Sequence, residues 1–171
     1  MVKVLVSSCL IGAPVRYNGT DKKVSHPILD RWVQEGRVVP ACPEVLGGLG
    51  TPRPPAEVIH VQRDRRVVAD TGRDVTSEFE RGAALAVEQA RRNDVSIAVL
   101  KDGSPSCGSR WIYDGTFSGS RVAGEGVTAA LLRKCGIRVF SEEELEAADA
   151  AITEMEEDER RNVTMTDGSN G

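Results

Sequence analysis

The apolar run Val95 to Leu100 (VSIAVL) is the feature that most constrains the fold of this chain. Its length and composition predict a strand buried on both faces, which is typical of a central position in a parallel sheet. The segment from Asp74 to Asn93 directly precedes it. Apolar residues recur there at the spacing of one helix face: Val75, Phe79, Ala83, Ala86 and Ala90. A helix that leads into a buried strand indicates an α/β arrangement.

The same alternation recurs along the chain. Strands are expected at residues 2–7, 37–40 and 137–140, with helices from Pro27 to Gly36, at 127–134 and after a capping box formed by Ser141 and Glu144. Segments 57–62 and 66–69 predict a β-hairpin. We therefore expect a single α/β domain over residues 1–150, built on one doubly wound, mostly parallel sheet with an inserted β-hairpin. Residues 156–171 form an acidic, polar tail that we expect to be disordered.

Composition excludes several classes of function. The formal net charge is −4, so a nucleic acid is an unlikely partner, because its phosphate backbone calls for a basic face. No apolar run approaches the roughly 20 residues of a membrane helix. The apolar stretch from Val2 to Val6 is too short for a signal sequence. We expect a cytoplasmic protein with reduced thiols, whose oligomeric state the sequence leaves open.

Three of the four cysteines are expected at one edge of the sheet. Cys9 follows the first predicted strand, Cys42 the second, and Cys107 lies in the loop after the strand that ends at Leu100. Ligands of open parallel sheets bind outside the carboxyl ends of the strands. Cys9, Cys42 and Cys107 therefore predict a shared site, whereas Cys135, near a helix end, is expected to be a small buried hydrophobe.

The residues alone leave the kind of site open. No Cys-x-x-Cys occurs, which argues against a thioredoxin-type dithiol and an ordinary zinc ribbon. Spacing does not separate a three-cysteine zinc ion from a three-cysteine iron–sulfur cluster. Either one would leave a metal position open, which is typical of a catalytic site.

Neighbouring residues add chemistry to the predicted site. Glu44 lies two residues after Cys42 and could transfer protons beside a metal, although a solvated loop glutamate is the alternative. Ser104 offers a hydroxyl near Cys107 that could bond cluster sulfur or a substrate. The glycines at 47, 48 and 50 match no phosphate-binding loop, so we interpret them as allowing backbone to approach a bulky cluster. Three further side chains of these loops could steady an anionic or aromatic substrate, although we expect each of them to be solvated at the surface: Arg16, Tyr17 and Arg53.

The motifs around these residues resemble those of the bacterial thiouracil desulfurase family. The resemblance covers about residues 2 to 145. It departs at Asn18 and Gly50, where the family more often has Asp and Pro. The matching motifs are SCLIG (8–12), VRYNG (15–19), CPE (42–44), GGL (47–49), PR (52–53), SPSCG (104–108), YDGTF (113–117) and GEGVT (124–128).

This resemblance implies a [4Fe–4S] cluster held by Cys9, Cys42 and Cys107. It implies that the sulfur of a thiolated pyrimidine binds the iron without a protein ligand, and that 2- or 4-thiouracil is converted to uracil and sulfide without net redox change. Glu44 is then the first candidate for proton transfer and Ser104 the second. The expected partner is a small-molecule thiolated base. Two alternatives stay open: a sulfide-carrying or redox iron–sulfur protein, and a three-cysteine zinc protein.

Overall fold

The computed structural model describes residues 1–167 and is built around a parallel sheet. Its four strands follow the order β2-β1-β5-β8. They comprise Lys3–Ser7 (β1), Val38–Ala41 (β2), Val95–Leu100 (β5) and Arg138–Ser141 (β8). Val6 of β1 pairs with Pro40 on one side and with Val99 on the other. Because the strands run parallel, their carboxyl ends meet at one edge of the sheet.

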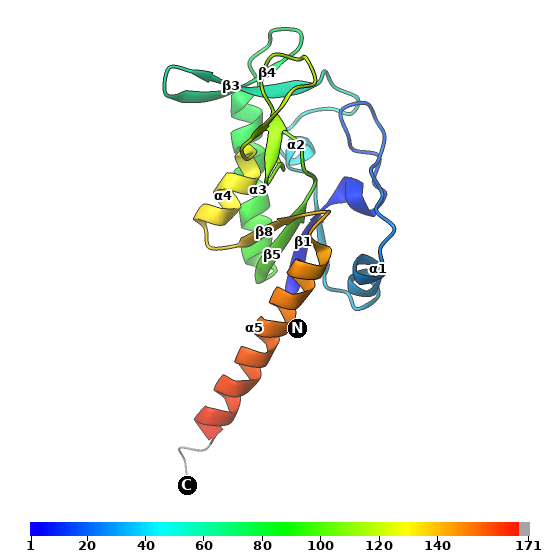
Figure 1. Cartoon of the computed structure of the whole chain (residues 1–171), viewed down its shortest axis with the longest axis vertical. Helices are drawn as coiled ribbons and strands as arrows, with labels where there is room; N and C mark the ends of the chain where they lie inside the picture. Colours follow the sequence, from blue (N-terminus) through cyan, green and yellow to red (C-terminus); the bar gives the residue numbers. More distant parts are fainter. Residues whose placement is uncertain (168–171) are drawn as a thin grey trace.

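Helices cover both faces of the sheet (Figure 1). Helix α1 (Pro27–Gln34) and the first part of α5 (Leu145–Asp167) share a core with one face, whereas α3 (Thr76–Arg92) and α4 (Val127–Lys134) share a core with the other. Successive side chains of a strand point to opposite faces of the sheet. Val4 and Val6 therefore pack in the core with α1 and α5, and Leu5 packs in the core with α3 and α4. The predicted doubly wound α/β fold is confirmed.

The two hairpins lie beyond the carboxyl edge of the sheet. Ala56–Val61 (β3) and Asp64–Ala69 (β4) form the predicted hairpin, in the upper part of Figure 1. Trp111–Tyr113 (β6) and Arg121–Ala123 (β7) form a second one that the sequence did not reveal. These strands of three residues are too short to show a period in a glycine-rich segment. The hairpins and α3 share a small apolar core that includes Val58, Phe79 and Ile112.

Two short helices also occur in segments that were expected to be loops. Ser8–Ile11 forms a 3₁₀ turn (η1) directly after β1, and Pro43–Leu46 forms one turn of helix (α2) directly after β2. Pro43 at the first helical position favours α2, because its missing N–H needs no partner there. Each of these turns begins beside a cysteine of the predicted site.

The beginning of α5 differs from the predicted capping box. The N–H of Ser141 donates to Glu144 Oε1 (3.0 Å), and the Ser141 hydroxyl accepts the N–H of Glu143 (3.2 Å). Ser141, however, ends β8, and the helix begins at Leu145. The reciprocal bonds therefore shape the strand-to-helix turn rather than the first helical turn.

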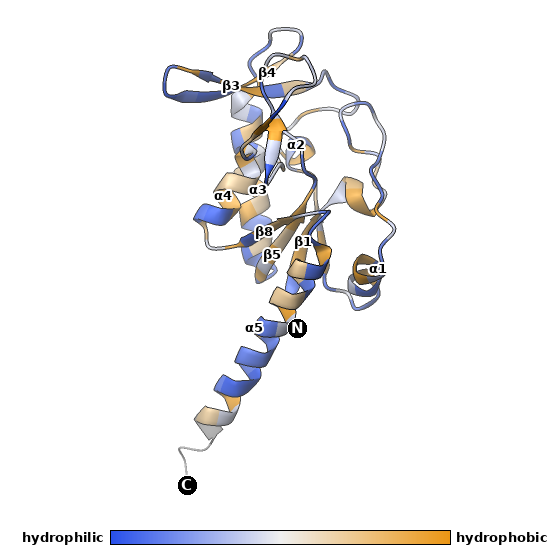
Figure 2. Ribbon diagram, in the orientation of Figure 1, coloured by the Kyte–Doolittle hydropathy of each residue, from blue (hydrophilic) through white to orange (hydrophobic). Residues whose placement is uncertain are grey.

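Helix α5 continues to Asp167, although the sequence predicts disorder from residue 156. Glu, Arg and Met are good helix formers, and Arg161 pairs with Asp158 one turn away. This part of α5 extends past the sheet and is mostly hydrophilic (Figures 1 and 2). Residues 168–171 of the predicted tail lie outside the described residues. Among those described, no helix combines the length and hydropathy needed to cross a bilayer.

Helices α2 and α3 cross at very close range through two glycines. A Cβ atom added to Gly47 would lie 2.0 Å from the carbonyl oxygen of Glu78, and one added to Gly82 would lie 1.9 Å from that of Pro43. Such separations leave no room for a side chain on either backbone. The crossing fixes α2, which carries Glu44 and follows Cys42. Gly47 thus serves helix packing, while close approach of this segment to a cluster stays a prediction.

Candidate functional site

A cavity of about 800 Å³ lies beyond the carboxyl ends of β1, β2 and β5. The loops after these strands form its floor, and residues of both hairpins contribute to its wall, among them Glu57, Trp111 and Tyr113. A crevice at this edge is where open α/β sheets generally bind ligands.

All three predicted cysteines line this cavity. Cys9 lies in η1, Cys42 is the residue between β2 and α2, and Cys107 lies in the loop after β5. Cys9 and Cys107 are buried, and Cys42 is half-buried. Residues far apart in the sequence thus present thiols to one space because three parallel strands end there.

Burial disfavours the thiolate form of these three cysteines. Burial raises the pKa of Cys9 to about 11, with a further contribution from the nearby Cys42. Burial also raises the pKa of Cys107, against a hydrogen bond from the Ser7 hydroxyl, and that of Cys42, against the backbone N–H of Val45. Three thiolates here would need a compensating positive charge, so a cationic metal group would bind with release of protons.

The separation of the donors bears on what the site can hold. Across residues 1–167, no three Cys, His, Asp or Glu side chains are grouped closely enough to hold a single metal ion. In a zinc site three thiolates would bind one ion, whereas in an iron–sulfur cluster each thiolate binds a different iron.

Glu44 and Ser104 lie together beside the cysteines. The Ser104 hydroxyl lies 3.5 Å from Glu44 Oε1 and accepts the N–H groups of Ser106 (3.1 Å) and Cys107 (3.0 Å). Because both amides donate to the Ser104 oxygen, its own proton is left to point toward Glu44. The Glu44 side chain is only 13% exposed, which excludes the alternative of a solvated loop glutamate.

Arg53 is a neighbour of Glu44 whose burial and pairing the sequence did not reveal. Its side chain is 8% exposed, so the expected surface solvation is wrong. Nε donates to Glu44 Oε2 (2.7 Å) while the Nη2 atom, which also pairs with Glu44, donates to the carbonyl of Val15 (2.9 Å). Arg53 thereby fixes Glu44 and joins the loops that follow β1 and β2. Its signals in the sequence are its place in the cysteine-bearing loops and the PR motif (52–53) of the family resemblance.

The remaining candidates fall in different places. Arg16 and Tyr17 line the cavity, and Tyr17 is partly exposed there. Asn18 bonds within its own turn, since its Oδ1 accepts from the Thr20 hydroxyl (2.6 Å). Cys135 is exposed at the end of α4, so its interpretation as a buried hydrophobe is wrong. A position just past a helix terminus gives little cover to a side chain.

Fold and site together define a class: doubly wound α/β proteins with a thiol-lined cavity at the carboxyl edge of the sheet. Residues 4–144 match the family model of 2-thiouracil desulfurase, and the chain belongs to this family. It is 46% identical over 148 residues to the uncharacterized protein YbbK of Bacillus subtilis (strain 168), a match that spans 83% of this chain and 97% of YbbK.

A solved structure is also similar. The [4Fe–4S]-dependent thiouracil desulfidase TudS superposes with a TM-score of 0.85 at 50% sequence identity, over 90% of this chain and 99% of that one. At this identity the likeness extends well beyond a shared fold. The predicted family is confirmed, and both the family and TudS are named for an enzymatic activity.

Proposed function

We propose that this chain is a [4Fe–4S]-dependent, non-redox desulfurase that converts thiolated pyrimidine bases such as 2- or 4-thiouracil to uracil and sulfide. The observation that carries the proposal is the meeting of three cysteines with the Glu44–Ser104 pair in one cavity. Family membership and the likeness to TudS support the cofactor and the type of substrate.

Cys9, Cys42 and Cys107 would hold the cluster. The donor set suits it, since these three cysteines line one cavity from three separate strand ends, and thiolates are the ligands that bind iron–sulfur clusters. When bound, the cluster supplies a Lewis-acidic iron that can accept the soft sulfur of a thiocarbonyl group. With three protein ligands for four irons, one iron would be left for the substrate.

The protein itself supplies proton transfer. Replacing a thiocarbonyl by a carbonyl consumes one water and yields hydrogen sulfide, so no electrons are exchanged, but protons must move from the water to the departing sulfur. Glu44 can accept the proton of the attacking water, and Arg53 holds the carboxylate in place for that step. The Ser104 hydroxyl, 3.5 Å from Glu44, can pass a proton onward to the substrate.

Activity without a reductant tests this function directly. We expect protein reconstituted anaerobically with iron and sulfide to be brown, to hold about four irons per chain, and to release equal amounts of sulfide and uracil from 2- or 4-thiouracil. Iron analysis, sulfide assay and chromatography of the base measure this. A fully loaded protein that releases no sulfide would contradict the substrate. Turnover that requires a reductant would favour a redox protein, and colourless protein with one zinc a zinc protein.

Replacing Glu44 with glutamine should lower kcat by about 100-fold, because the amide keeps the shape of the side chain but cannot accept a proton. Iron content should stay at the wild-type level. Steady-state sulfide release from the loaded variant measures the effect. Glu78→Gln is the matched control, because Glu78 also lines the cavity and pairs with an arginine, Arg73 (2.9 Å), but does not contact Ser104. A wild-type kcat for Glu44→Gln would exclude Glu44 as the proton acceptor.

A further inference from the structure

Asp102 is a buried carboxylate that the proposed reaction does not use. It lies two residues after β5 and five before Cys107, and its side chain is 2% exposed. A carboxylate removed from water to this extent costs several kcal/mol unless its oxygens are fully bonded. The hydrogen bonds of its two oxygens therefore indicate the structural role of this buried carboxylate.

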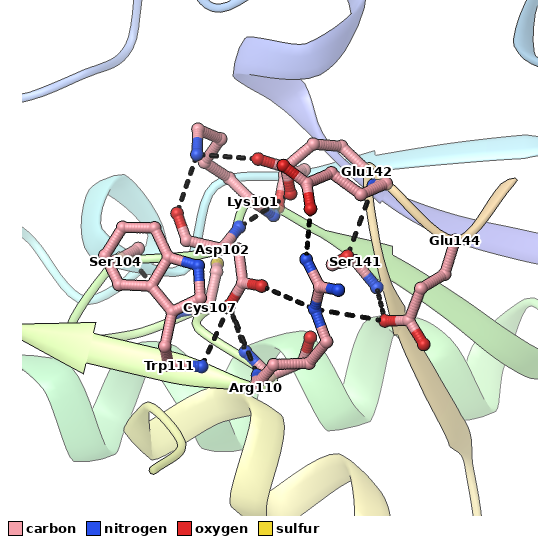
Figure 3. Close-up of polar contacts among 12 residues, drawn as sticks. Lys101, Asp102, Ser104, Cys107, Arg110, Trp111, Ser141, Glu142 and Glu144 are labelled. Atoms are coloured by element: carbon pink, nitrogen blue, oxygen red, sulfur yellow. Dashed lines mark hydrogen bonds and ion pairs between the residues drawn. The ribbon is translucent and has the colours of Figure 1, made fainter. Parts of the chain in front are cut away.

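Both oxygens of Asp102 bond to the segment that directly follows Cys107 and Gly108 (Figure 3). Oδ1 accepts the backbone N–H groups of Ser109 (3.1 Å), Arg110 (3.2 Å) and Trp111 (3.3 Å). Oδ2 accepts Nε of Arg110 (2.9 Å). Burial alone would raise the pKa of Asp102, but these hydrogen bonds outweigh it and hold the pKa below its usual value.

These bonds close the loop on which Cys107 lies. Asp102 begins the loop, and the three amides that it gathers end it. Inside the loop, Cys107 N–H donates to the Ser104 hydroxyl (3.0 Å) and Gly108 N–H donates to the Ser104 carbonyl (2.9 Å). The position of Cys107, and with it that of Ser104, thus depends on a ring of bonds that Asp102 completes.

Acidic residues from the turn after β8 tether this ring to the sheet. Glu142 accepts the N–H of Asp102 (2.8 Å) and pairs with the ammonium group of Lys101 (2.7 Å), as Figure 3 shows. Arg110 reaches the same turn through Glu143 (2.6 Å). Lys101 and Asp102 are among the residues that line the cavity, whereas Arg110, Glu142 and Glu143 are not, so the loop is also held by side chains from outside the cavity lining.

We propose that Asp102 is a positioning residue that holds the Cys107 loop in its ligand-ready form. Through this loop it sets how firmly the third cysteine binds the cluster, a consequence that rests on the proposed function. Local opening of the loop would expose the Cys107 thiol and remove one of the three cysteines from the site.

Alkylation of the apoprotein tests the positioning without any cluster. We expect Asp102→Asn to raise the rate at which iodoacetamide labels Cys107 by about 10-fold or more, measured by mass spectrometry, with the labelling of Cys9 and Cys135 as internal references. Asp74→Asn is the matched control, since Asp74 also caps backbone, accepting the N–H of Thr76 (2.9 Å), and pairs with an arginine, Arg66 (2.6 Å), away from the cysteines. Asp74→Asn should leave the Cys107 rate unchanged.

Cluster retention tests the consequence. In reconstituted Asp102→Asn, iron loss to a chelator should be about 10-fold faster than in wild type, and the electron paramagnetic resonance spectrum of the reduced cluster should change, whereas Asp74→Asn should match wild type. A folded Asp102→Asn that labels and loses iron at wild-type rates would overturn the proposal, as would faster labelling without faster iron loss.

Arg110→Gln covers the case in which Asp102→Asn does not fold. This variant keeps the carboxylate and removes one donor to it. It should therefore increase the labelling rate of Cys107 and the rate of iron loss, each by a smaller factor than Asp102→Asn does. Wild-type rates for Arg110→Gln would then overturn the proposal. If wild-type protein takes up no cluster, the proposed function fails, while the labelling rates still decide whether Asp102 positions the loop.

Discussion

Replacing Cys42 or Cys107 with serine should abolish sulfide release from thiouracil and lower the iron content well below that of the wild type. Serine nearly preserves the size of cysteine but replaces a thiolate by a hydroxyl, which remains protonated and is a poor ligand for iron. Both thiols line the cavity from different strand ends, so neither can substitute for the other.

Cys135→Ser provides the control for this substitution. Its thiol is exposed at the end of α4 and faces Arg91 (3.7 Å) rather than the cavity. The variant should keep the brown colour, the iron content and the rate of the wild type. Anaerobic reconstitution followed by iron analysis and sulfide assay compares the three variants. Full activity in Cys42→Ser or Cys107→Ser would remove that residue from the proposed ligand set.

Replacing Gly82 with alanine should destabilise the protein by about 3 kcal/mol or more. The new methyl group would lie 1.9 Å from the carbonyl oxygen of Pro43, and backbone at that position cannot rotate away as a side chain could. To relieve the clash, α2 must move away from α3. Glu44 lies in α2 and Cys42 directly precedes this helix. We therefore expect cluster content and kcat to fall together with stability.

Gly50→Ala is the matched control from the same glycine-rich segment. The nearest atom to an added Cβ there, the carbonyl oxygen of Pro52, is 3.9 Å away, an ordinary contact. Its effect on the free energy of unfolding should stay below about 0.5 kcal/mol. Urea unfolding of the apoproteins measures both variants. Equal stability of Gly82→Ala and wild type would show that the two helices can separate at no cost.

The sequence was sufficient for the parallel sheet and for the grouping of the cysteines. Val95–Leu100 was recognised with the observed bounds because a strand buried on both faces leaves a continuous apolar run. Cys9, Cys42 and Cys107 could be grouped because each follows a predicted strand, and parallel strands end at one edge. The metal and the substrate came from family resemblance, since thiolates bind several metals.

Features that arise from tertiary packing were beyond sequence reasoning. Burial of Arg53 depends on how two loops meet, which local pattern does not encode. The role of Gly47 depends on its distance from Glu78 in another helix. In the sequence Asp102 is an ordinary loop aspartate, and only the structure shows that the backbone N–H groups of residues 109–111 donate to it. Such contacts join segments whose separation in the sequence carries no signal.

The strand order also governs when the site can come into being during synthesis. β1 is made first but lies in the interior of the sheet, between β2 and β5. Cys9 and Cys42 can therefore meet on the nascent chain once β2 has paired, whereas Cys107 joins them only after β5 has entered the sheet. Before β5 has paired, the site would present the thiols of Cys9 and Cys42 but not that of Cys107. Cluster delivery to this protein is accordingly expected to follow the entry of β5 into the sheet, which makes this folding step of the apoprotein precede maturation.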